Sequence, residues 1–295
     1  GWAGRDDIDQ EISRITTASP AAVKYYIEGK RIYNEGRYQE SMVLFKKALG
    51  IDPKFAMAYR SLAWASAHLG RIEDRRRYFN RTFQLRENLS DRERLLIEAD
   101  YYGEREETYG QALRAYHQLS VLYPQDREIN RSLGLAHRFI EDWQPALRYL
   151  QKCVRNRDPS IDSYLFLSSC YRVLGRYSRA RRELKLYRRR FADHPELHIY
   201  EARAFQYQGR LEKALRILNA VDLGDLSPDV VLEIDTRKAE CLCLMNRFRE
   251  AERILEGYRR SDRHNLRIVL ELRHLQVLRG NHREAVKILE DFLDH

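Results

Sequence analysis

A pattern that returns every 34 residues limits the folds open to this chain more than any other property of its sequence. The segment 22–55 carries Gly29 at its position 8, Gly36 at position 15 and Pro53 at position 32, and similar residues return when this frame is moved along the sequence. Such a period indicates one supersecondary unit used repeatedly, because each unit buries its apolar face against its neighbours. One array is therefore expected, although 295 residues would otherwise suggest two globular domains.

Two positions of the frame show how each unit is built. Position 20 is small in seven units, which lets the two helices of a unit cross closely, and its residues are Ser41, Ala112, Ala146, Ala180, Ala214, Ala251 and Ala285, with Arg75 in the second unit. Position 15 suits a left-handed turn after the first helix, and its residues are Gly36, Gly70, Gly175, Gly209 and Gly280, with Glu107, Glu141 and Asn246 in the other units. The pattern predicts helix, turn and helix in each unit.

Eight units follow a short leader. Residues 1–21 form this leader, in which Ile8, Ile12 and Ile15 indicate a short amphipathic helix. Three-residue insertions at 90–92 and 229–231 interrupt the frame, and their capping residues predict that each lengthens the start of the next helix. The predicted units are 22–55, 56–89, 93–126, 127–160, 161–194, 195–228, 232–265 and 266–295.

The composition agrees with a helical array. Hydrophobic residues make up 43% and charged residues 33%, while glycine and proline number only 14 and 7, which disfavours both disorder and an all-β fold. No apolar run is long enough for a membrane span, and a cytoplasmic location is expected, with a membrane-attached or extracytoplasmic parent left open. The cysteines lack metal-ligand spacing and are expected to be buried thiols; they are Cys153, Cys170, Cys241 and Cys243.

Signatures of catalysis are missing from the sequence. It contains no phosphate-binding glycine loop, no zinc-protease helix motif, no nucleophile elbow, no kinase catalytic loop and no calcium-binding loop. We therefore expect a protein that is not an enzyme and that uses neither a cofactor nor a metal ion.

The repeat resembles the tetratricopeptide repeat, a helix-turn-helix unit of about 34 residues. The resemblance implies an all-α fold, a right-handed α-solenoid (superhelix) of about eight units. It also implies a concave groove that binds peptide segments through positions 2, 5, 9, 12 and 13 of the first helices. The residues of this chain at those positions that we expect to form the groove are Tyr26, Lys30, Tyr33, Asn34, Arg60, Trp64, His68, Arg94, Tyr101, Arg105, Arg131, Arg138, Arg172, Arg203 and Tyr207. Positive groups thin out in the last quarter, where Thr236, Glu240 and His274 hold these positions.

Such a groove favours a protein or peptide partner that is acidic or carries a free carboxylate. Arginine pairs with carboxylates through two hydrogen bonds and stacks on aromatic rings, so the partner is also expected to have apolar anchors. Part of the arginines are expected instead to form solvated pairs along their own helices. The tetratricopeptide carboxylate clamp has lysine at position 5 and asparagine at position 9, where this chain has Tyr26 and Lys30.

Two alternatives remain open. One is a structural scaffold that acts through its ends, including a weak homodimer through the C-terminal repeat. The other is nucleic-acid binding, which the net charge of +9 and the arginine runs at 75–77 and 188–190 would suit. Nucleic acid is the less expected partner, because both runs fall in or just after second helices, on the convex side.

A closer resemblance covers roughly the first 125 residues. The runs ITTAS at 15–19, AMAY at 56–59 and DRER at 91–94, the last followed by Tyr101 and Tyr102, are similar to repeat regions attached to bacterial serine/threonine protein kinases and related signalling proteins. This resemblance implies that the chain is the sensory or scaffolding part of a larger regulator. The glycine at residue 1 agrees with a piece of a longer protein.

Overall fold

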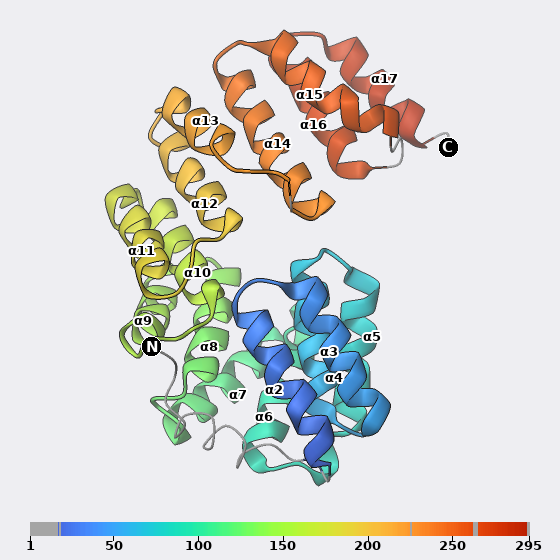
Figure 1. Cartoon of the computed structure of the whole chain (residues 1–295), viewed down its shortest axis with the longest axis vertical. Helices are drawn as coiled ribbons and strands as arrows, with labels where there is room; N and C mark the ends of the chain where they lie inside the picture. Colours follow the sequence, from blue (N-terminus) through green and yellow to red (C-terminus); the bar gives the residue numbers. More distant parts are fainter. Residues whose placement is uncertain (1–16, 18, 225, 262–264, 294–295) are drawn as a thin grey trace. The chain divides into compact units, whose positions relative to one another are not determined.

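The computed structural model describes residues 17, 19–224, 226–261 and 265–293, so the helix predicted from Ile8, Ile12 and Ile15 lies outside the described part. Within this part there are sixteen α-helices, two short 3-10 helices and no strand (Figure 1). The helices are α2 (Pro20–Asn34), α3 (Tyr38–Ile51), α4 (Ala56–His68), α5 (Ile72–Gln84), η1 (Arg86–Asn88), α6 (Asp91–Tyr102), η2 (Glu106–Thr108), α7 (Tyr109–Leu122), α8 (Arg127–Phe139), α9 (Trp143–Arg155), α10 (Ile161–Val173), α11 (Tyr177–Arg190), α12 (Pro195–Gln206), α13 (Leu211–Asn219), α14 (Pro228–Leu244), α15 (Phe248–Ser261), α16 (Leu266–Leu278) and α17 (His282–Leu293).

The α-helices follow one another as helix-turn-helix pairs, from α2 with α3 to α16 with α17. Short connections of this kind bring consecutive helices together as packed neighbours. The all-α repeat solenoid predicted from the sequence is therefore confirmed. None of the described helices combines the length and the apolar character that crossing a bilayer requires.

The turns after the first helices follow the predicted pattern in seven pairs. The five glycines at position 15 have positive φ values between 68° and 85°, and Glu141 and Asn246 adopt φ values of 58° and 59° at the same position. The third pair differs, because α6 ends at Tyr102 and Glu107 lies in the short helix η2. In this pair, Glu107 stands at position 15 and lies in the extra short helix η2 instead of a left-handed turn.

Small residues allow the two helices of a pair to approach closely. At position 20, Ser41 and the six alanines are all buried, while Arg75 extends outward to Glu104, with 3.0 Å between Nε and Oε2. Position 8 is similarly confined, since a Cβ added to Gly29 would lie 2.6 Å from Cε1 of Phe45. These contacts explain the small residues at position 20 and at Gly29.

Both insertions lengthen the helix that follows them, as predicted. Helix α6 begins at Asp91 after Ser90, whose Oγ accepts a hydrogen bond from the Glu93 backbone N–H at 3.3 Å and donates one to Glu93 Oε2 at 3.0 Å. Ser90 is thus the N-cap that the sequence indicates, with Glu93 three residues later bonded to its hydroxyl. Helix α14 begins at Pro228 and is 17 residues long, the longest of the described helices.

The chain divides into two compact units, one ending at Cys170 and the other beginning at Tyr171. The first has a core that includes Phe45, Phe55 and Leu133. The second has cores around Ile199 and Leu255. All four cysteines are buried and free, as predicted, and the predicted boundaries of the eight repeats stay a prediction.

Candidate functional site

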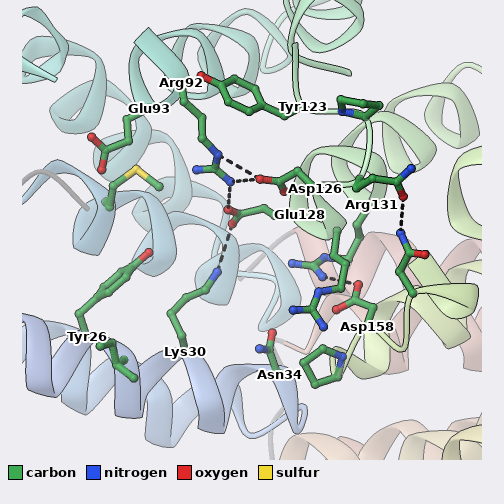
Figure 2. Close-up of a pocket in the computed structure, with 17 residues that line it drawn as sticks. Tyr26, Lys30, Asn34, Arg92, Glu93, Tyr123, Asp126, Glu128, Arg131 and Asp158 are labelled. Atoms are coloured by element: carbon green, nitrogen blue, oxygen red, sulfur yellow. Dashed lines mark hydrogen bonds and ion pairs between the residues drawn. The ribbon is translucent and has the colours of Figure 1, made fainter. Parts of the chain in front are cut away.

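A charged pocket lies on the inner side of the first unit. It has a volume of about 610 Å³. It is bordered by α2, α4, α6 and α8, by the loop before α8 and by the loop after α9 (Figure 2). Both signs of charge line it in equal number. The cations are Lys30, Arg92, Arg127 and Arg131, and the carboxylates are Glu93, Asp126, Glu128 and Asp158. The pocket is therefore charge-balanced, whereas none of its four carboxylates was among the residues predicted for the groove.

Glu128 is the centre of this arrangement. Its Oε1 accepts a hydrogen bond from Lys30 Nζ at 3.1 Å, and its Oε2 lies 3.4 Å from Arg92 Nη2 (Figure 2). The same Oε1 also accepts from Arg60 Nη1 at 2.7 Å. Burial would raise the pKa of Glu128, but these three cations together with Arg131 outweigh burial and hold this pKa well below its usual range. One carboxylate of α8 thus ties together α2, α4 and α6.

Arg60 belongs to the interior of the first unit. Its residue is only 2% exposed, and its Nε donates to Asp100 Oδ2 at 2.5 Å. The same oxygen accepts from Trp64 Nε1 at 3.0 Å, and Tyr116 donates its hydroxyl to the other oxygen of Asp100. The buried charge is paired and hydrogen-bonded on both sides, which is the condition under which such a pair is tolerated.

A second set of ion pairs lies beside the first. Arg131 Nη1 contacts Asp158 Oδ2 at 2.7 Å, and His68 Nε2 lies 3.3 Å from Asp162 Oδ2. Asp162 also accepts a hydrogen bond from Tyr38 at 2.8 Å, a residue 124 positions earlier in the sequence. Burial would raise the pKa of Asp162, but His68, Arg131 and the Tyr38 hydrogen bond together outweigh burial and lower this pKa.

The structure brings eight of the predicted groove residues together in the first unit. They line the large pocket or the small cavity beside it, and they are Tyr26, Lys30, Tyr33, Asn34, Arg60, Trp64, His68 and Arg131. Arg138 lies next to this group, with its guanidinium 5.1 Å from the ring centre of Phe166, which lines the small cavity. The role of these residues as a peptide groove stays a prediction.

Three predicted residues of the third repeat lie elsewhere. Tyr101 stacks on Phe83 of α5 with 4.0 Å between ring centres, and the Arg105 guanidinium lies 6.0 Å from the Tyr101 ring centre. Arg94 pairs with Asp91 on the same helix at 2.8 Å. Helix α6 instead directs Arg92 and Asp100 to the interior, so its inward face differs from the face that the frame selects.

The sequence analysis missed the carboxylates that neutralise the predicted cations. Glu128 and Asp162 occupy position 2 of the fourth and fifth repeats, one of the groove positions from which only the basic, polar and aromatic residues were selected. Asp100 occupies position 8, where the first, second and fourth repeats have Gly29, Ala63 and Gly134. A carboxylate at a position that is glycine or alanine in those three repeats was the sequence signal that could have identified Asp100.

Arg203 is the notable cation of the second unit. In the part of the chain that the structure describes, no carboxylate lies within ion-pair distance of its guanidinium. Burial lowers the pKa of Arg203, and repulsion from Arg237 and Arg172 lowers it further. Arg237 already binds Glu233 at 2.8 Å and Glu240 at 2.5 Å, and the Arg172 guanidinium packs 4.3 Å from the ring centre of Tyr207. An anion beside Arg203 would therefore be favourable.

Neither a metal centre nor a reactive thiol is evident in the described residues. No group of three or more histidine, cysteine, aspartate or glutamate side chains there is arranged to hold a metal ion. Burial raises the pKa of the Cys241 thiol to about 11, far from the range of an activated nucleophile.

An array of helix-turn-helix pairs with charged inner faces places the chain in the class of helical repeat solenoids. A model of the tetratricopeptide repeat family matches residues 33–55. The fold is similar to the human IFIT1 dimer with m7Gppp-AAAA, at 14% identity and a TM-score of 0.55, covering 98% of this chain and 71% of that chain. It is also similar to a tetratricopeptide repeat protein from Parabacteroides merdae, at 13% identity and a TM-score of 0.52, covering 91% of this chain and 100% of that chain.

No curated protein matches the sequence. The motif and the similar structures together support a tetratricopeptide repeat protein, and at these identities the structural likeness concerns the fold alone. A fold of this kind supports a protein-interaction scaffold, and the family is typically non-catalytic.

Proposed function

We propose that this chain is a non-catalytic interaction module that binds an acidic or carboxylate-bearing segment of a partner protein along its inner helix faces. The tetratricopeptide motif and fold support the interaction role. The observation that carries the acidic preference is Arg203, a partly buried guanidinium with two cationic neighbours and no carboxylate partner among the described residues.

The two units contribute differently to this proposal. In the pocket of the first unit, a partner carboxylate would have to share Lys30 and Arg92 with Glu128 and Asp126. At Arg203 a partner carboxylate would meet a cation without such a competitor, and a two-pronged arginine–carboxylate contact would form. The exposed ring of Tyr207 nearby offers an apolar surface for the residue next to the carboxylate.

The test uses a fluorescent peptide of alternating glutamate and leucine residues and a twin with glutamine in place of glutamate. Fluorescence anisotropy with the whole chain should show binding of the acidic peptide, weakened about tenfold or more by Arg203→Gln, since charged hydrogen bonds contribute about 1.5–3 kcal/mol. Arg182→Gln is the matched control, because Arg182 is an exposed arginine of the same unit. Equal binding of the two peptides, or an Arg203→Gln variant that binds like the wild type, would contradict the proposal.

A scaffold that acts through its C-terminal end is the second candidate. Leu293 is 79% exposed on α17, the last described helix, and Val286 on the same helix is also exposed. Exposed apolar side chains on a terminal helix favour a self-association surface. Sedimentation at rising concentration should then show a weak homodimer that Leu293→Glu returns to the monomer, and a monomer at every concentration would exclude it.

Nucleic-acid binding has less support. Arg75, Arg76 and Arg77 each lie within ion-pair distance of a carboxylate, and Arg188 contacts Asp193 and Glu201 at 2.9 and 2.8 Å. The first run is thus paired along its whole length and the second at Arg188, although a fold-level neighbour is a structure with m7Gppp-AAAA. A mobility-shift assay with RNA and DNA oligonucleotides at low salt should show no complex.

We also propose that the module is the scaffolding part of a larger bacterial signalling protein that works in the cytoplasm. The support is the resemblance of roughly its first 125 residues to kinase-attached repeat regions. The coding sequence on either side of this segment is the direct test, and a parent without any regulatory or catalytic domain would contradict the proposal.

A further inference from the structure

A second pocket, with a volume of about 370 Å³, lies in the second unit and is lined mainly by α14 and α16. Leucine side chains form much of its surface. Leu244, Leu270 and Leu278 all line it and are 52%, 43% and 42% exposed. Several exposed leucines around one hollow indicate a docking surface, whereas single exposed leucines need no explanation.

A carboxylate without a partner borders this apolar surface. Among the described residues, Glu271 of α16 makes no hydrogen bond and no ion pair. Burial raises the pKa of Glu271, and the nearby carboxylate of Glu240 raises it further. Glu240 already accepts hydrogen bonds from Arg237 at 2.5 Å and from Gln206 at 3.4 Å. A cation supplied from outside would therefore be favoured at Glu271.

Two other polar groups line the same pocket. Arg273 has a buried Nε with no hydrogen-bond acceptor among the described residues, and His274 is exposed. The charges that act most on Glu271 come from Glu240, Arg237 and Arg267, so Arg273 does not compensate it. A partner that suits the pocket must therefore offer a cation to Glu271.

The spacing of the leucines fits a helix as the occupant. Leu270 and Leu278 are eight residues apart on α16, which corresponds to about 12 Å along a helix. Apolar side chains at i and i+7 of a partner helix span a similar length, and an amphipathic helix in an apolar groove is a common mode of peptide recognition. The same partner helix can carry a basic side chain beside its row of apolar side chains.

We propose that this pocket binds a basic amphipathic helix of a partner protein, with leucine-type side chains over Leu244, Leu270 and Leu278 and an arginine or lysine paired with Glu271. The charge preference is opposite to that proposed at Arg203. The two proposed sites consist of different residues, so an experiment can disprove one proposal without disproving the other.

The probe is a fluorescent synthetic helix of about 18 residues, long enough to be partly helical, with leucines on one face and arginines beside them. Its twin has glutamate in place of each arginine. Anisotropy with the whole chain should show the arginine peptide binding about tenfold more tightly than the twin. Glu271→Gln should narrow this difference, because it removes the charge that distinguishes the two peptides.

Leu270→Gln should weaken binding of the arginine peptide about tenfold through loss of apolar contact. Val121→Gln replaces an exposed apolar residue of the first unit and should change nothing, as should Arg182→Gln at an exposed arginine of the second unit. All variants alter exposed or partly exposed side chains, and thermal unfolding at the wild-type midpoint shows that they fold.

Three outcomes would overturn the proposal. One is no binding of the arginine peptide, or equal binding of the two peptides. Another is wild-type binding by both Leu270→Gln and Glu271→Gln. The third is a homodimer that Leu270→Gln dissociates, which would make a second copy of this chain the occupant.

Discussion

Asp100 stands at position 8 of its repeat, where the repeats on either side have Ala63 and Gly134, and it places a carboxylate inside the first unit. Arg60, Trp64 and Tyr116 all donate hydrogen bonds to it. A buried ion pair is costly to form but far more costly to break, because removal of one partner leaves the other charge uncompensated. This residue therefore controls the stability of the inner helix faces.

Asp100→Ala should lower the free energy of unfolding of the first unit by about 3–5 kcal/mol, because buried Arg60 keeps only Glu128 as a partner, and Trp64 and Tyr116 lose their acceptor. Urea unfolding followed by circular dichroism measures this change. The control is Glu73→Ala, which removes an exposed carboxylate 3.6 Å from Arg76 and should cost at most about 0.5 kcal/mol. A double variant, Arg60→Met with Asp100→Leu, should regain part of the loss, and a mild Asp100→Ala would argue against the buried pair.

Glu128 predicts how stability depends on pH. Its pKa is well below the usual range in the folded chain, so its contribution is present above the unfolded pKa of about 4.3. That contribution is lost as the pH falls through the folded pKa, because the unfolded state then binds more protons. Thermal midpoints between pH 7 and pH 3 should fall steeply for the wild type and less steeply for Glu128→Gln. Parallel curves would contradict the assigned ion pairs.

The helix pair is held together at its crossing points. Gly29 lies where α2 meets α3, and an added Cβ would lie 2.6 and 2.8 Å from two ring carbons of Phe45. Phe45 is fully buried and cannot move aside without displacing its neighbours. Position 8 is therefore constrained by space and not by backbone conformation.

Gly29→Ala should destabilise the chain by about 1–3 kcal/mol through overpacking, although alanine is the better helix former. Gly50→Ala is the matched control, since Gly50 lies in α3 with nothing within 4 Å of an added Cβ. It should leave stability unchanged or raise it by about 0.5 kcal/mol. Denaturant titration separates the two cases, and equal effects of both substitutions would show that crowding is not the cause.

The molecule as a whole is an array whose stability is built from neighbour contacts. Such arrays open locally, and a substitution mainly affects the repeats that it touches. The contacts of this array cluster into two units, which divide between Cys170 and Tyr171.

Hydrogen exchange should reveal this locality. Asp100→Ala is expected to accelerate amide exchange in α4, α6, α7 and α8, and to leave exchange in α14 to α17 close to that of the wild type. Mass spectrometry of proteolytic fragments measures both regions in one experiment. Uniform loss of protection along the chain would show instead that the units unfold together.

The fold was predictable because the repeat is a local property. Helix, left-handed turn and helix are set within 34 residues by glycines, small residues and capping residues, so Gly36, Ser41 and Ser90 could be interpreted without knowledge of any other unit. The third pair departs from the frame because an extra turn at Glu107 replaces the left-handed residue. The repeat pattern could not predict how the chain turns where glutamate replaces glycine.

The sequence by itself determined an all-α array, its buried thiols and a set of inner-face residues. Only the tertiary structure decided which of those residues keep an unpaired charge: Arg60 is neutralised by Asp100 and Glu128, whereas Arg203 is not. The reason is that ion pairing depends on how helices far apart in sequence face each other. Lys30 and Glu128 are 98 residues apart, and a periodic frame places each on a face without saying what lies opposite.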